Sequence, residues 1–298
     1  MTAPRQVLEG STFLVTRRCS ERRFFLRPSS VVNGIFRYVL ALAARRYGVL
    51  LHACCVMSNH FHLVVTDPRG RLPEFQQYLD GLLARALNVV LGRREAFWTR
   101  DSYSAVRLET RASVVEKCAY VLANPVAAGL VRRGRSWPGV WTDPRSVGGE
   151  PQLVERPAGF FRKNGPTKAA VWLKLECPPG FASVEEFVGE LEGSVREAEE
   201  RARVEVEREG RTFQGAAHVL AQSPGASPGG SEPFGALKPN VACRDKWKRI
   251  EALLRLASFR AAYREALEAW RAGVRDVVFP AGTWLMRVHH AVQCAQAG

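Results

Sequence analysis

Four side chains in this sequence have the chemistry of a metal-assisted nucleophilic site. His60 and His62 stand two residues apart in the apolar run from Val56 to Val65. Side chains alternate along a strand, so both imidazoles would project from one face. They could therefore act as a pair of metal ligands, although most such pairs in strands are incidental, and the prediction needs support from elsewhere in the chain.

That support comes from Tyr120 and Asn124, which are four residues apart. In a helix this spacing puts both side chains on one face, so a nucleophile and a third metal ligand could stand side by side. Two neutral imidazoles and an amide oxygen suit Mg²⁺ or Mn²⁺ with open positions, whereas zinc would prefer more nitrogen or sulfur. The plain alternatives are that Tyr120 lies at the edge of the core and that Asn124, before Pro125, only ends a helix.

The charge distribution favours a polyanionic partner. The 298 residues carry a net charge of +14, and residues 1–147 hold 22 Lys and Arg against 10 Asp and Glu, which is +12. The basic excess therefore accompanies the histidine and tyrosine motifs, and nucleic acid is the commonest partner of such a field. Arginines mixed with an exposed aromatic could grip phosphates and stack on a base, although the aromatic could equally anchor the core. The candidate DNA contacts are Arg17, Arg18, Arg93, Arg94, Trp98 and Arg100.

The elements that must position these residues follow from hydrophobic periodicity. Strands are expected at 11–18, 49–57, 60–66 and 101–108, and helices at 29–47, at 73–91 and from 110 to Pro125, the last with capping-box spacing at Ser113 to Glu116. The order β-α-β-β-α-β with a following helix predicts an α+β, ferredoxin-like antiparallel sheet, with helices on one face and the other face free for a ligand.

The rest of the chain, 148–298, is predicted to be a mostly helical extension of a first domain at 1–147. It holds one short strand at 170–175, a charged helix at 183–209, a linker-like stretch at 223–231 and a last helix at 244–272. The apolar stripe of that last helix is expected to be core. Its members are Trp247, Ile250, Leu253, Leu254, Ala257, Ala261 and Leu267.

The motifs resemble a known family. The His-Phe-His run after Met-Ser-Asn, the later Tyr-x-x-x-Asn-Pro-Val-x-x-Gly-Leu-Val, and the opening strand from Phe13 to Arg18 are similar to the HUH single-tyrosine transposases, and among them to the REP-associated tyrosine transposases (RAYTs). The resemblance covers residues 10–145. It implies the HUH nuclease fold, His60, His62 and Asn124 as ligands of the ion, and Tyr120 as the nucleophile that forms a 5′-phosphotyrosine and leaves a free 3′-OH.

The leading hypothesis is therefore a metal-dependent single-strand DNA endonuclease and strand-transferase. The resemblance implies a hairpin-containing, REP-like DNA substrate, and it favours a monomer over a homodimer. A non-catalytic, domesticated hairpin-binding protein is the main alternative, and an RNA-directed phosphodiesterase is a weaker one. Seven cysteines without Cys-x-x-Cys spacing, a polar start and no apolar run of membrane-spanning length predict a cytoplasmic, nucleoid-associated protein without a membrane partner.

Overall fold

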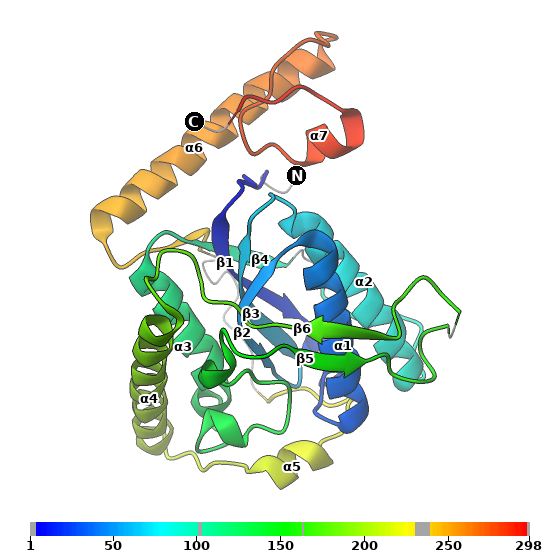
Figure 1. Cartoon of the computed structure of the whole chain (residues 1–298), viewed down its shortest axis with the longest axis vertical. Coiled ribbons are helices and arrows are strands. Elements are labelled where there is room, and N and C mark those ends of the chain that lie inside the picture. Colours follow the sequence, from blue (N-terminus) through cyan, green and yellow to red (C-terminus); the bar gives the residue numbers. More distant parts are fainter. Residues whose placement is uncertain (1–3, 101–102, 163, 230–238, 297–298) are drawn as a thin grey trace.

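The computed structural model of the chain describes residues 4–100, 103–162, 164–229 and 239–296. Figure 1 shows a twisted sheet between two layers of helices, with α6 and α7 beyond one end of it. In chain order the elements are β1 (Ser11–Arg18), α1 (Ser30–Tyr47), β2 (Leu50–Val56), β3 (His60–Asp67), α2 (Leu72–Val90), β4 (Ser104–Leu108), α3 (Arg111–Ala127), β5 (Gln152–Glu155), β6 (Ala170–Leu173), α4 (Val184–Arg208), α5 (Ala216–Ala221), β7 (Val241–Ala242), α6 (Lys246–Arg271) and α7 (Leu285–His290). Short 3-10 helices occupy Ser20–Arg22, Gly134–Ser136 and Pro144–Ser146.

The central sheet has the strand order β2-β3-β1-β4-β7. The first four strands are antiparallel, and β1 pairs with β3 from Ser11↔Asp67 to Arg18↔His60. With α1 and α2 as the crossovers, this order is ferredoxin-like. The predicted α+β fold and antiparallel sheet are therefore confirmed. Strand β7 adds a feature that the sequence did not predict, because it pairs with β4 in parallel through Arg107↔Val241 and Leu108↔Ala242.

We call the sheet surface that carries Phe61 the first face. Helices α1 and α2 cover it and enclose the larger hydrophobic core, which includes Phe13, Val15 and Leu63 of the strands. The Ser29 side chain caps α1 by accepting a hydrogen bond from Val32 N, and the helix ends at Gly48, whose φ of 70° suits glycine. The two helices and the first face thus enclose a core that is sealed from solvent.

The opposite surface, the second face, carries His60 and His62. Helix α3 packs on β2 and β3 there, and α4 packs along α3. The core between them includes Val64 of β3, Leu122 of α3 and Phe187 of α4. The expectation that this face is free was wrong in part, because an apolar side of α3 needs the same cover that α1 and α2 need. The part that α3 leaves uncovered holds the candidate site.

Helix α3 begins where it was predicted, but its N-cap residue and its end differ from the prediction. The side chain of Thr110 is the N-cap and accepts from Ser113 N at 3.2 Å, so Ser113 is inside the helix and is not its cap. Pro125 does not end the helix, which continues to Ala127. One lost backbone hydrogen bond is tolerated because the helical residues around it, such as Val121 and Leu122, are buried. Asn124 consequently stays helical, one turn beyond Tyr120.

The segment after α3 runs along the free edge of β2, where Val56 N donates to Val140 O at 2.8 Å. It then forms a β5-β6 hairpin that lies against α1 (Figure 1). Only β6 was predicted. Strand β5 was missed because its four residues, Gln152–Glu155, are mostly exposed and show no apolar alternation. The predicted linker lies in the described residues only at 223–229, where Ala226 O accepts from Phe24 N at 2.9 Å.

Helix α6 corrects the predicted apolar stripe. Trp247 is 75% exposed and Leu254 is 62% exposed, so the first half of that stripe faces away from the protein. The buried side instead carries Phe259 and Tyr263, and the Tyr263 ring packs 5.6 Å from that of Phe279. Large aromatic rings bury more apolar area than the predicted aliphatic residues, and they decide which side turns inward. In the described part of the chain, no helix combines the length and apolarity needed to cross a membrane.

Candidate metal and nucleophile site

The two histidines of the predicted pair lie on the second face of β3. Across the strand pair, Arg18 of β1 stands opposite His60, and Thr16 stands opposite His62. The two imidazole centroids are 4.7 Å apart with planes at 81°. His60 Nδ1 donates to Asn59 Oδ1 at 2.6 Å. In the neutral ring this tautomer leaves the lone pair on Nε2, which is the atom that a metal ion would use.

His62 is the more constrained of the two imidazoles. It is 5% exposed, its Nδ1 is 2.7 Å from Thr16 Oγ1, and its Nε2 is 3.4 Å from the amide nitrogen of Asn124. Burial lowers the pKa of His62 well below its usual value, and the charges of His60 and Arg18 lower it further. The ring is therefore neutral at physiological pH, as a metal ligand must be. The hydroxyl of Thr16 fixes its orientation.

Tyr120 and Asn124 meet the histidines from helix α3. The Tyr120 ring centroid is 5.5 Å from that of His62 at an interplanar angle of 70°, and the Tyr120 side chain is 46% exposed. Burial raises the pKa of the Tyr120 phenol, while the Asn124 side chain and the Arg18 charge pull it down. The four predicted residues thus come together, with the phenol still accessible to a substrate.

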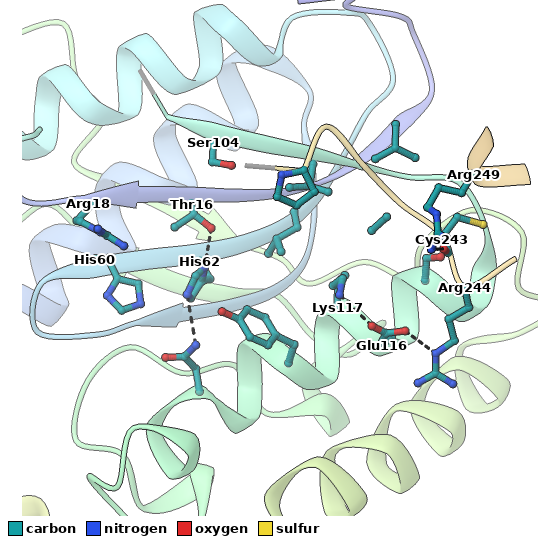
Figure 2. Close-up of a pocket in the computed structure, with 18 of the residues that line it drawn as sticks. Thr16, Arg18, His60, His62, Ser104, Glu116, Lys117, Cys243, Arg244 and Arg249 are labelled. Carbon is teal, nitrogen blue, oxygen red and sulfur yellow. Dashed lines mark hydrogen bonds and ion pairs between the residues drawn. The ribbon is translucent and has the colours of Figure 1, made fainter. Parts of the chain in front are cut away.

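These residues stand at one end of a cleft of about 1040 Å³. Its walls are the second face of β1, β3 and β4, helix α3, and the segment from Pro239 to Arg249 around β7. Figure 2 shows Thr16, His60 and His62 on the strands and Lys117, Glu116 and Arg244 farther along the same cleft. A cleft of this size lies at the upper end of the range of about 300–1,000 Å³ that is usual for small-molecule sites.

Several cleft residues were not predicted. Among the described residues that line it, Arg18, Lys117, Arg244 and Arg249 are cationic, and Glu116 alone is acidic. Of these five, Arg18 was predicted as a DNA contact and the other four were not. Lys117 could have been found from the sequence, because it is one helical turn before Tyr120. The two later arginines could not, since only the pairing of β7 with β4 brings them to the site.

Of the six predicted DNA contacts, Arg18 lines the cleft and the others do not. Arg17 is on the first face, where its Nε is 3.1 Å from Asp80 Oδ2. Trp98 is 8% exposed, and its indole donates to Asp80 O at 2.9 Å, so its ring is a core anchor with no face open for base stacking. Arg93 lies over the Phe25 ring, while Arg94 and Arg100 are exposed outside the cleft.

The donor set can be tested for its fit to a divalent ion. In the described part of the chain no three His, Cys, Asp or Glu side chains gather as a metal site. A site here therefore needs the amide of Asn124 as its third protein donor. His62 Nε2 lies 3.4 Å from the amide nitrogen of Asn124, so turning this amide by half a turn would bring its oxygen to the same place. His62 and His60 each use Nδ1 for a short hydrogen bond, to Thr16 and to Asn59. Two nitrogens and one oxygen on one side of an open cleft fit Mg²⁺ or Mn²⁺.

Comparisons with known proteins give the following results. No protein-family model matches the sequence, and no curated protein matches it. The structure is similar to one described as a REP-associated tyrosine transposase bound to a REP hairpin, with 17% sequence identity, 49% of this chain and 84% of that chain covered, and a TM-score of 0.42. It is also similar to a putative transposase from Deinococcus radiodurans R1, with 21% identity, 36% and 85% coverage, and a TM-score of 0.28. We base the proposed function on the geometry of the site.

Proposed function

We propose that this protein is a metal-dependent enzyme of the RAYT type that cuts and rejoins single-stranded DNA next to a hairpin, with Tyr120 as its nucleophile. The observation that carries the proposal is the convergence of His60, His62, Tyr120 and Asn124 on one cationic cleft. The pairs that define it are the two imidazoles at 4.7 Å, the Tyr120 and His62 rings at 5.5 Å, and the Asn124 amide at 3.4 Å from His62 Nε2.

In the proposed reaction the Tyr120 oxygen attacks the scissile phosphorus. A bond forms between that oxygen and phosphorus, the bond from phosphorus to the 3′ oxygen breaks, and the phenol proton is balanced by the proton that the 3′-OH gains. The 5′ end stays attached to the protein, so the 3′-OH can reverse the step without an external energy source. Attack by a phenol requires deprotonation, and burial opposes it by raising the pKa of Tyr120. The charge of Arg18 works in the opposite direction.

His60, His62 and Asn124 would hold Mg²⁺ or Mn²⁺. When bound, such an ion withdraws charge from the phosphate and orients the phosphorus for in-line attack. Thr16 contributes indirectly, because its hydroxyl holds the His62 ring through Nδ1. Mn²⁺ binding to the DNA-free protein, measured by calorimetry, should be lost in His62→Ala and weakened about 10- to 100-fold in Thr16→Val. Thr16→Ser should restore it, since it keeps the hydroxyl.

The site would be complete within one chain, because strand β3 and helix α3 of the same chain bring the imidazoles and the phenol together. We therefore propose that a monomer is the active form. Mixing Tyr120→Phe with His62→Ala tests this point. The mixture should stay inactive if each site uses its own residues, and recovery of activity would show that two chains exchange α3.

A covalent-adduct assay tests the enzyme proposal. A labelled DNA hairpin with a single-stranded tail is incubated with the full chain and Mn²⁺, and the products are separated on a denaturing gel. The wild type and the control Tyr78→Phe, altered on α2 over the first face, should both retain label, and Tyr120→Phe should not. Binding of the hairpin without any adduct would favour the non-catalytic alternative. If unlabelled RNA competes with the labelled hairpin more strongly than unlabelled DNA does, the result would favour the hypothesis of an RNA-directed phosphodiesterase.

A further inference from the structure

The cleft has a second end, chemically different from the histidine end, that the proposed chemistry does not use. Its charged residues are Lys117 and Glu116 on α3 and Arg244 and Arg249 beyond β7. Lys117 Nζ is 2.9 Å from one oxygen of Glu116, and Arg244 Nε is 2.6 Å from the other. Figure 2 shows Lys117, Glu116 and Arg244 joined by these two ion pairs. One carboxylate is therefore paired with two cations.

The backbone that carries Arg244 is held firmly in place. Strand β7 hydrogen-bonds to β4 through Arg107 N and Asn240 O at 2.9 Å, and Val241 and Cys243 on either side of Ala242 are buried. Farther along α6, Arg255 pairs with Glu109 at 2.9 Å. These contacts fix the segment to the sheet without help from Arg244 itself, whose side chain is 73% exposed.

Stability explains the pairing of Arg244 with Glu116 poorly, because that arginine is largely exposed and exposed ion pairs contribute little to folding. Burial opposes ionisation of Glu116, but hydrogen bonds from Lys117 and Arg244 outweigh it and lower its pKa, so the group is a carboxylate at neutral pH. A carboxylate between a lysine and an arginine occupies the place that a phosphate of similar charge and hydrogen-bonding capacity would take. Arg249 lines the same end and remains as an additional positive charge beside it.

The position of this end relative to the nucleophile identifies its ligand. Lys117 Nζ lies 5.9 Å from the ring centroid of Tyr120, one helical turn away on the same helix. A strand whose scissile phosphate reaches the Tyr120 hydroxyl would continue along the cleft toward these cations. We propose that Lys117, Arg244 and Arg249 form a binding site for a backbone phosphate of the single strand that flanks the cleavage position, an inference that rests on the proposed function.

The first test measures binding alone. The full chain carries Tyr120→Phe so that no adduct can form, and the probe is a fluorescein-labelled 20-nucleotide thymidine strand titrated at several salt concentrations. Arg244→Ala should weaken binding about tenfold. Because each phosphate neutralised on a single strand contributes about 0.7 to the log-log salt slope, removing this one phosphate contact with Arg244→Ala and Arg249→Ala together should reduce the slope by about 0.7. Arg244→Lys keeps the charge and should keep the slope.

The matched control is Arg264→Ala, which removes an exposed arginine outside the cleft on α6, the helix that carries Arg249. It should leave affinity and slope unchanged. Equal losses in Arg244→Ala and Arg264→Ala would overturn the inference, because they would show a diffuse effect of net charge. An unchanged slope in the double variant that still unfolds cooperatively would overturn it as well.

The second test locates the phosphate. Hairpin substrates carry one uncharged methylphosphonate at successive positions beside the cleavage point, and adduct formation is measured with the wild type and with Arg244→Ala. One flanking position should reduce the wild-type yield, and that sensitivity should disappear in the variant. If no substrate gives an adduct but the salt slope falls as expected, the proposed function fails and the phosphate site stands. If adducts form and no flanking position depends on Arg244, the function stands and the phosphate site fails.

Discussion

The two faces of the central sheet are made by alternate residues of the same strands, yet they do different work. On β3, Phe61, Leu63 and Val65 enter the core under α1 and α2, while His60 and His62 point to the other side. The first face is closed by two helices. The second is closed only in part, by α3. The candidate site residues lie where helices do not fully cover the sheet. Burying a polar group costs free energy unless the group has a hydrogen-bond partner.

Sealed and open regions also differ within the second face itself. His52 lies under cover, 1% exposed, and both of its ring nitrogens have partners in Glu176 O at 2.7 Å and Thr66 Oγ1 at 2.8 Å. His62 instead has a firm partner on one nitrogen and only the long Asn124 contact on the other. A histidine with two good partners is structural, and one whose second nitrogen faces a cleft is suited to bind a ligand.

The largest expected effect comes from His62→Ala on the open part of the second face. Adduct formation with the DNA hairpin should fall by about 10³-fold or more, the scale seen when a group essential to the chemical step is removed. The folded state should survive, because the ring borders the open cleft and each hydrogen bond that it loses is worth about 1 kcal/mol. Adduct yield and urea denaturation measure the two effects. The exposed His218→Ala serves as the control and should change neither, whereas wild-type yield in His62→Ala would contradict the assigned site.

The neighbouring residue on the sealed face should behave in the opposite way. Phe61 is fully buried, with its ring 5.3 Å from Phe36 and 5.7 Å from Trp98. Phe61→Ala should lower the free energy of unfolding by about 3–5 kcal/mol, because it leaves a cavity between two helices and the sheet. Urea denaturation measures the loss. In the fraction that remains folded, Mn²⁺ affinity should stay near wild type, and a selective loss of that affinity would show that the two faces are coupled.

A smaller effect, the pH dependence of stability, distinguishes the buried His52 from His62 at the cleft. Burial lowers the pKa of His52 from 6.5 to about 4, opposed by its hydrogen bond to Glu176 and that residue's charge. The folded state thus favours the neutral ring, so its contribution to stability is complete above pH 6.5 and is lost as the pH falls toward 4. Between pH 7 and 4.5 this should amount to about 2–3 kcal/mol. His52→Gln should show a correspondingly shallower decline in urea denaturation, and an unchanged decline would assign it to other groups.

The helices and strands of most of the first 125 residues could be predicted because each has a local sequence signal. The alternation of His60 and His62 with Phe61 defines a strand with two distinct faces, and Ser29 and Gly48 mark the ends of α1. Pro125 shows where local rules fail, since the burial of α3 outweighs the tendency of proline to end a helix. The cationic end of the cleft was out of reach, because a two-residue strand, Val241–Ala242, gives no periodic signal and its partner lies more than a hundred residues earlier.

Arg17, one of the predicted DNA contacts, lies away from the cleft for a different reason, one that the sequence did contain. Alternation along β1 puts Arg17 on the same face as Phe13 and Val15, which is the sealed one. The rule that grouped His60 with His62 therefore separates Arg17 from them. Charge alone suggested Arg17, but its side chain pairs with Asp80 inside the protein. The type of a residue indicates what it could bind. Its odd or even position along the strand decides which face of the sheet it lies on, and therefore whether a ligand in the cleft could reach it.

The smallest predicted effect tests this separation at Trp98, on the sealed face. Trp98→Phe keeps an aromatic ring beside Phe61 and Phe97 but removes the indole donor to Asp80 O. The free energy of unfolding should fall by about 1 kcal/mol, the scale of one buried hydrogen bond. Affinity for the 20-nucleotide thymidine strand should stay within about twofold, whereas loss of a stacked base costs about 1–3 kcal/mol. Trp98→Ala is unsuitable because it would also open a cavity. A clear loss of affinity in Trp98→Phe without a matching loss of stability would mean that the first face contacts DNA, and the division between a structural and a functional face would then fail.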